Sequence, residues 1–111
     1  MEIKIDFGEP IIAVSDVMSL MPTDLNDFYA DASDLDKSNL FFVLLLSAQY
    51  YEDKMDKEKA AHLYFLTAFY LFVPLTPPGS CMLALHYIKK ALVLNTLPEY
   101  QEWLELIQKG N

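Results

Sequence analysis

The sequence predicts an all-α protein, an antiparallel stack of helix pairs preceded by an acidic N-terminal arm. Residues 60–88 contain no Asp, Glu, Lys or Arg, and the run Thr76–Ser80 (TPPGS) divides them into two apolar segments. Proline lacks a backbone donor and glycine tolerates turn geometry, so this run separates two helices whose inner faces pack together. A further segment, Leu40–Tyr51, is apolar on nearly every side, which is typical of a helix buried on more than one face.

Residues 1–7 alternate between apolar and charged side chains. The apolar members are Ile3, Ile5 and Phe7. A period of two predicts a short strand or an extended arm, ended by Gly8-Glu9-Pro10. Because the chain offers no partner strand, this segment would pair with a second copy, add to another protein, or lie extended across the helices.

Two short helical segments are expected in the rest of the arm. The first lies within Ile11–Met21, with Ser15 or Asp16 as a cap, and Pro22 stops it. The second is an acidic helix near Asp24–Ala32, capped within Thr23–Asn26. Residues 32–39 have the composition of a linker, so we divide the chain into an arm, residues 1–38, and a helical domain, residues 39–111.

Four helices are predicted in the helical domain. Ser38 or Asn39 caps the first, Leu40–Tyr51, and Asp56 caps the second, Lys57–Val73. Glu58 lies in the first turn of that second helix, where the helix dipole favours an acid.

The last two helices have their own start and stop signals. Ser80 is a possible cap for Cys81–Leu94. Pro98 at a first helical position opens the last helix, which runs to Lys109 and stops at Gly110.

The net charge is −8, and it is concentrated at the front of the chain. Residues 1–38 contribute −7 of it and residues 39–111 only −1, and the chain has no arginine. Nucleic-acid binding requires clustered Lys and Arg, so we exclude a nucleic-acid partner. The acidic arm would suit a basic protein partner, or would keep an apolar protein in solution.

Cysteine usage and the length of the apolar segments favour a cytoplasmic protein. Cys81 is the only cysteine, so an internal disulfide is impossible, and no secretory signal is recognisable. A membrane span needs about 20 apolar residues, and the uncharged segment Ala60–Leu75 has sixteen. The alternative for this segment is a re-entrant membrane hairpin.

No catalytic constellation, cofactor motif or metal site is recognisable. His62 and His86 lie on different predicted helices without a Cys or an acid at metal-ligand spacing, and we expect both at the edge of the core. Cys81 is expected to be a small buried apolar residue. The acids Asp31 and Asp34 belong to a run that lacks the glycine and distal glutamate of a calcium loop. We therefore expect a protein that is not an enzyme.

The pattern Ala84-x3-Ile88-x2-Ala91, followed by Pro98 and then Trp103-x2-Leu106, resembles the passage from the second helix of a tetratricopeptide repeat to the first helix of the next. Small residues at Ala84 and Ala91 let helices approach closely. The resemblance covers residues 39–109. Upstream, two phases compete: Leu63-x2-Leu66-Thr67-x2-Tyr70 is similar to the first-helix pattern, and Ala61-x3-Phe65-x2-Ala68 to the second-helix pattern.

The resemblance implies two sets of functional residues. If the upstream first-helix phase holds, the concave, partner-binding face consists of Ala61, Tyr64, Ala68, Leu71 and Phe72. Packing between repeats would fall to Ala84, Ile88, Ala91, Trp103 and Leu106. Small residues beside aromatic ones form pockets for an apolar anchor of a partner. The chain is 53% hydrophobic, which favours an interface in addition to a core.

The leading functional expectation is a small chaperone or adaptor that covers a hydrophobic or amphipathic helix of another protein. In size, acidity and architecture the chain resembles the chaperones of bacterial type III secretion systems. An alternative is an acidic inhibitor or immunity protein that blocks a basic or nucleic-acid-processing enzyme through residues 2–36. A homodimer that hides the same apolar surface is a third possibility.

Overall fold

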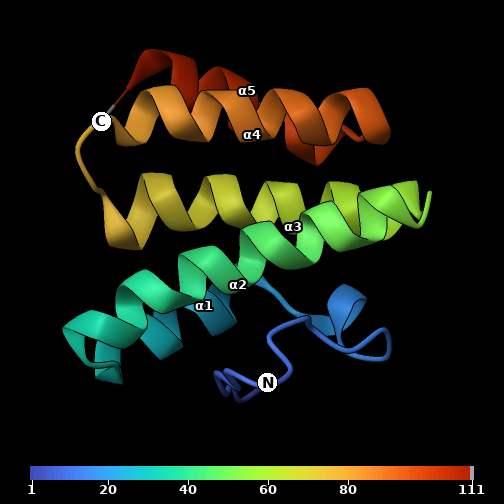
Figure 1. The fold of residues 1–111 in the computed structure, drawn as a ribbon. Helices are drawn as coiled ribbons and strands as arrows, with labels where there is room; N and C mark the ends of the chain where they lie inside the picture. Colours follow the sequence, from blue (N-terminus) through green and yellow to red (C-terminus); the bar gives the residue numbers. More distant parts are fainter. Residues whose placement is uncertain (111) are drawn as a thin grey trace.

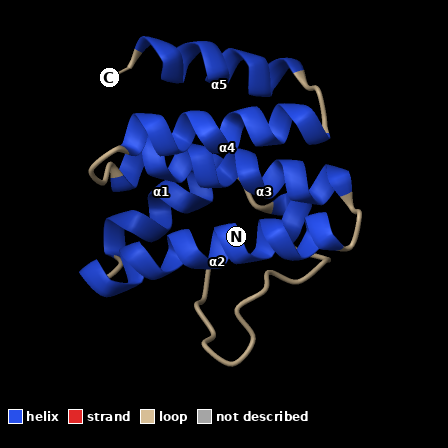
Figure 2. Ribbon diagram, turned by 45° about the horizontal axis from the view of Figure 1, so that its top comes forward, coloured by secondary structure: helices blue, strands red, loops and turns tan. Residues whose placement is uncertain are grey.

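A computed structural model describes residues 1–110, and within them it contains five α-helices and two short helical turns. The helices are α1 (Pro22–Asp31), α2 (Asp34–Asp53), α3 (Lys57–Tyr70), α4 (Ser80–Leu94) and α5 (Pro98–Lys109). The turns are η1 (Val17–Ser19, 3₁₀) and η2 (Leu71–Leu75, π). No strand occurs among the described residues (Figure 2). The predicted all-α stack is confirmed.

Helix α3 lies in the middle of the molecule. Figure 1 shows α4 and α5 on one side of it, and α2, α1 and the N-terminal arm on the other. Every residue from Ala60 to Tyr70 is buried. Because this segment has no charged side chain, none of its faces needs water, and neighbours can cover it all round. The prediction that residues 60–88 hold two helices packed against each other is confirmed, with α4 as the partner of α3.

The buried polar side chains of α3 find partners inside the protein. His62 Nε2 lies 2.7 Å from the Leu20 carbonyl oxygen, so this nitrogen carries the proton and donates it. The Thr67 hydroxyl donates to the Leu63 carbonyl at 2.7 Å, and the Tyr70 hydroxyl donates to the Lys37 carbonyl at 2.5 Å. No buried side-chain nitrogen or oxygen of residues 1–110 lacks a partner, which removes the penalty of burying polar groups.

Several predicted helix ends are confirmed. The Asp56 side chain accepts from the Lys59 backbone nitrogen at the start of α3, with Glu58 in the first turn. Pro98 opens α5 and Gly110 follows its last residue.

The predicted linker before the first long helix is wrong over most of its length. Helix α2 starts at Asp34, six residues before the predicted Leu40. The Ser33 hydroxyl accepts from the Asp36 backbone nitrogen at 3.2 Å, and two acids in the first turn favour the positive end of the helix dipole.

The connection from α3 to α4 also differs from the prediction. Helix α3 gives way to the π turn η2, in which the Thr76 backbone nitrogen bonds the Leu71 carbonyl at 3.1 Å. The wider turn accommodates Pro74, which has no backbone donor. Ser80 is the first residue of α4 and not its cap, which is Gly79 in a left-handed conformation with φ of 76°.

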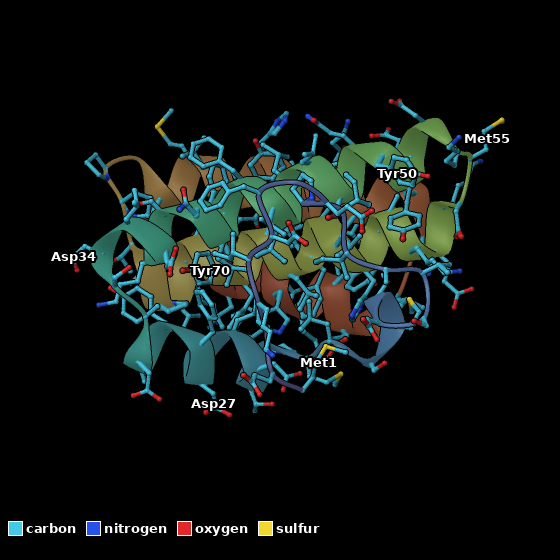
Figure 3. The ribbon with its side chains drawn as sticks, turned by 60° about the horizontal axis from the view of Figure 1, so that its bottom comes forward. Met1, Asp27, Asp34, Tyr50, Met55 and Tyr70 are labelled. Atoms are coloured by element: carbon cyan, nitrogen blue, oxygen red, sulfur yellow. The ribbon has the colours of Figure 1, made fainter. Side chains whose placement is uncertain are left out.

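Helices α1 and α2 take up the second half of the predicted arm, so from here the arm means residues 1–16 only. These residues contain no helix and do not form the strand that their alternation allowed. The arm crosses α2 (Figure 3) and has no strand beside it, so no ladder can form. Its backbone instead bonds side chains of α2. The Ile12 backbone nitrogen donates to the Ser47 hydroxyl at 2.9 Å, and the Tyr51 hydroxyl donates to the Ile12 carbonyl at 2.6 Å. At the other end of the arm, the Met1 amino group donates to the Asp24 carboxylate at 2.8 Å.

The two predicted arm helices are both shorter or shifted in the structure. The segment Ile11–Met21 contains only η1 as a helical element. Helix α1 starts at Pro22, where the Asp24 carboxylate accepts from the Met21 backbone nitrogen at 2.8 Å. Proline needs no hydrogen-bond partner at a first helical position, so α1 begins there.

We expect Leu66→Ala to lower the free energy of unfolding by about 2–5 kcal/mol, because it opens a cavity beside a helix that has no room to shift. The matched control is Leu35→Ala on α2, which is 69% exposed in the wild type. This control should change the free energy by no more than about 0.5 kcal/mol. Urea unfolding followed by circular dichroism measures both. Equal effects of the two variants would contradict the central position of α3.

Candidate functional site

The five residues predicted to form a concave partner-binding face all lie in the core. Ala61, Tyr64, Ala68, Leu71 and Phe72 are at most 4% exposed. They are covered because helices flank α3 on both sides, so they offer no docking surface in this structure, and this part of the prediction is corrected. Tyr64, for example, stacks on Tyr87 of α4 with 6.1 Å between the ring centroids.

The residues predicted to pack between repeats divide into three groups. Ala84, Ile88 and Ala91 form the buried stripe of α4. Trp103 is half-buried on α5, and its ring centroid lies 5.4 Å from that of Phe69. Leu106 is 47% exposed and does not belong to the residues of α5 that are buried, Tyr100 and Ile107. The packing role of Leu106 stays a prediction.

The structure does expose an apolar surface, and it lies on α2 and the arm. We call it the α2 surface and define it by Phe7, Leu35, Phe42, Leu46 and Tyr50. The α2 members follow one another at steps of seven, four and four, which places them on one side of the helix. The inner side of α2 buries a different set of residues. That set is Leu40, Leu44, Ser47, Ala48 and Tyr51.

A shallow groove of about 200 Å³ runs along the α2 surface where the arm meets the helix. Its walls are Ile5, Phe7, Pro10, Asn39, Phe42, Val43 and Leu46. Phe7 is 78% exposed and Phe42 is 63% exposed, so large rings stand at the rim of the groove and not inside the protein. None of the lining residues is charged, which suits an apolar side chain of a partner.

Acidic side chains border this surface. Asp6 and Glu9 flank Phe7 in the arm, and the Asp6 carboxylate accepts from the Gly8 backbone nitrogen at 2.8 Å, which shapes the turn. Asp34 is exposed at the start of α2 (Figure 3), and Asp53 is exposed at its end.

Two lysines also belong to these surroundings. Lys4 is exposed in the arm, and Lys54 lies 5.5 Å from the centroid of the Tyr50 ring. The acids outnumber them, so the border of the α2 surface is negative.

A second hollow is acidic and lies between the arm and α1. It has a volume of about 440 Å³. Its acidic lining residues are Glu2, Asp24, Asp27, Asp31 and Asp36. Ile3 and Phe28 add apolar wall. Five of the nine acids of residues 1–38 thus gather at this hollow, and Asp6, Glu9, Asp16 and Asp34 lie outside it.

One polar cluster connects three helices. The Glu52 carboxylate of α2 accepts from the Tyr64 hydroxyl of α3 at 2.6 Å and from Lys90 Nζ of α4 at 3.1 Å. The Tyr64 hydrogen bond, with Lys90 as the lesser cause, holds the pKa of Glu52 below its ordinary value, although burial opposes this shift. Burial, with Glu52 beside it, raises the pKa of Tyr64. The cluster therefore ties α2, α3 and α4 together.

The residues considered for chemistry are dispersed. His62 is buried against Leu20, whereas His86 is exposed on α4, where its ring centroid lies 5.0 Å from that of Tyr87. Cys81 is a free, half-buried thiol near the start of α4. Within residues 1–110 no three His, Cys, Asp or Glu side chains are grouped so as to hold a metal ion. Over the same residues, no helix is both long enough and apolar enough to cross a membrane.

Comparison with known proteins gives no relative. No protein-family model matches the chain, and neither a curated protein nor a solved structure is significantly similar to it. The fold and the surface described above therefore carry the functional argument.

The sequence contains a signal for the α2 surface. The prediction that Leu40–Tyr51 is buried on more than one side, because it is apolar nearly all round, does not distinguish its exposed stripe from its buried one. The spacing Leu35, Phe42, Leu46, Tyr50 separates a second stripe from the buried one. Phe7 could be placed beside it only from the structure, because its contact with α2 spans more than thirty residues of chain.

We expect the Glu52 cluster to stabilise the protein at neutral pH and not in acid. A lowered folded-state pKa contributes stability that is fully present above the ordinary value of 4.5, and this stability is lost as the pH falls through the folded value. The difference in unfolding free energy between wild type and Glu52→Gln should therefore shrink between about pH 7 and about pH 3. Urea titrations across this range measure it.

The control for that experiment is Glu105→Gln, which removes a carboxylate exposed on α5. Its difference from wild type should change far less over the same range. A Glu52→Gln difference that stays constant with pH would show that the charge of Glu52 contributes nothing through this cluster.

Proposed function

We propose that the protein is a non-enzymatic binding module that covers an amphipathic segment of another protein on its α2 surface. The single observation that carries this proposal is the uncharged groove between Phe7 and Phe42, bordered by exposed rings. Each large apolar side chain that leaves water on binding contributes about 1.5–3 kcal/mol. Scattered exposed apolar residues are ordinary on proteins, but a contiguous set on one face of one helix is typical of an interaction site.

The core itself favours binding over catalysis in this proposal. Its polar groups are engaged with one another, as the hydrogen bonds of His62, Thr67 and Tyr70 illustrate. Groups that are engaged in this way are not free to act as a nucleophile or a base toward a ligand. The module would thus act by burial of apolar surface, as a chaperone or adaptor does.

A more specific form of this proposal follows from the resemblance to tetratricopeptide repeats and to type III secretion chaperones. In that form the protein would act in the cytoplasm, keeping a partner from aggregating before export. The support is the stack of antiparallel helices, the net charge of −8 and the apolar surface.

A second candidate function is an acidic inhibitor of a basic enzyme. The acidic hollow between the arm and α1 favours it, because five carboxylates line about 440 Å³ there. An inhibitor bound through that hollow would weaken steeply with salt, since salt screens exposed charges. A complex on the α2 surface would persist, because apolar burial is not screened.

We expect Phe42→Asp with Leu46→Asp to abolish capture of the natural partner, because two charges would then have to be buried in the groove. The matched control is Val93→Asp. Val93 is 85% exposed and belongs to α4, a helix that lies across α3 from α2 (Figure 1). The three tagged proteins are incubated with extract of the native cell, and captured proteins are identified by mass spectrometry. Wild type and Val93→Asp should capture the same partner.

The captured complex is then reassembled from purified components and washed in about 1 M salt, where the Debye length is near 3 Å. Survival of the complex supports the chaperone or adaptor. If the complex is lost in salt and the two Asp substitutions do not affect capture, the chaperone or adaptor proposal is wrong and the acidic inhibitor replaces it. Circular dichroism melting of each variant checks that the fold is retained.

A further inference from the structure

We propose that the segment bound on the α2 surface is an amphipathic helix whose apolar stripe is bordered by lysine or arginine. This inference rests on the proposed function and specifies its partner by shape and charge. Two features of the described residues support it, namely the line of exposed side chains along α2 and the acids that border that line.

The shape of the surface fits a helix. From Leu35 to Tyr50 the exposed stripe covers about 22 Å along α2, at about 1.5 Å per residue. The backbone groups of α2 are used within the helix, so a partner meets side chains and not an open hydrogen-bonding edge. Ridges of side chains on one helix fit the grooves of another at this spacing, as in known helix-in-groove recognition.

The groove between the arm and α2 adds a deeper point of contact to this line. Phe7, Pro10 and Phe42 form its rim, and Val43 and Leu46 line it further along the helix. Its volume of about 200 Å³ suits one large apolar side chain of the partner. A helix lying on α2 would place one anchor residue there and its neighbours along Leu46 and Tyr50.

The charged side chains around the α2 surface determine which charges on the partner are favourable beside its apolar stripe. Asp6 and Glu9 are exposed in the arm, and Asp53 is exposed at the end of α2, whereas Asp34 at its start is paired with Lys37. The basic side chains nearby are fewer. Lys4 and Lys54 are exposed, whereas Lys37 is engaged by Asp34 at 3.8 Å and by the Tyr29 ring at 4.5 Å. A basic border on the partner complements this field, and an acidic border is repelled.

The same charges disfavour a second copy of the chain as the occupant. A symmetric dimer through the α2 surface brings one patch against itself, so the acidic borders would meet like charges. The net charge of −8 on each copy adds to this repulsion.

The test uses three synthetic peptides of about 18 residues, long enough for five helical turns. The first has an apolar stripe at helical spacing with a lysine border, and the second has the same stripe with a glutamate border. The third has the same amino-acid composition as the first, but its residues are scrambled so that no apolar stripe forms. Binding to the full-length protein is measured by fluorescence anisotropy at about 0.15 M salt. We expect the lysine-border peptide to bind at least about tenfold more tightly than either of the others.

Substitutions assign the preference to the named acids. Glu9→Gln with Asp53→Asn should reduce the advantage of the lysine border several-fold. Glu102→Gln with Glu105→Gln removes as much charge from the exposed side of α5 and should leave the advantage unchanged. Phe42→Asp should weaken the binding of the lysine-border peptide, because it places a charge in the groove.

The outcomes separate this inference from the proposed function. Equal binding of the two striped peptides, weakened by Phe42→Asp, overturns the charge preference and leaves the apolar surface as the docking site. Binding of the stripeless peptide as tight as the first overturns both and favours the acidic inhibitor. Sedimentation as a dimer that Phe42→Asp dissociates overturns the inference by making a second copy the occupant.

Discussion

The burial of α3 on all sides is the constraint from which the rest of the structure follows. A helix without charges between Ala60 and Tyr70 cannot present any face to water without cost, so it must be enclosed. Helices α2 and α4 cover two sides, and α1 with η1 closes a third. Helix α5 contributes two aromatic rings, because Tyr100 and Trp103 both lie against Phe65, at 5.2 and 6.3 Å.

Enclosing α3 determines which side of α2 remains free. Leu40, Leu44 and Ala48 must face α3, and the arm then covers a second side of α2 through the hydrogen bonds of Ile12. The third side has no neighbour among the described residues. Because its side chains are also apolar, α2 differs from an ordinary surface helix, whose outer face is polar. Helix α2 is apolar nearly all round, but its neighbours cover only two of its sides. The α2 surface is the apolar side that stays uncovered.

The fold could be predicted from the sequence because its signals are local. Pro98, Gly110 and the Asp56 cap mark helix ends, and the run Thr76–Ser80 interrupts a helix through the chemistry of its own residues. The candidate site could not be predicted as well, because it depends on which apolar residues are covered by segments distant in the sequence. Tyr64 and Phe42 are both aromatic residues in uncharged runs. Tyr64 is buried because α4 covers it, and Phe42 is exposed because the arm does not cover it.

The same division explains how the α2 surface can serve recognition while the core stays fixed. Helix α2 is tied on its inner side through Glu52, which bonds Tyr64 and Lys90, and through Ser47, which bonds the arm. None of these contacts involves the exposed stripe. Phe42 and Leu46 are 63% and 44% exposed, so a large part of each apolar side chain lies outside the core that these bonds hold together. An apolar stripe in that position is the expected outcome when α2 also has to meet a partner.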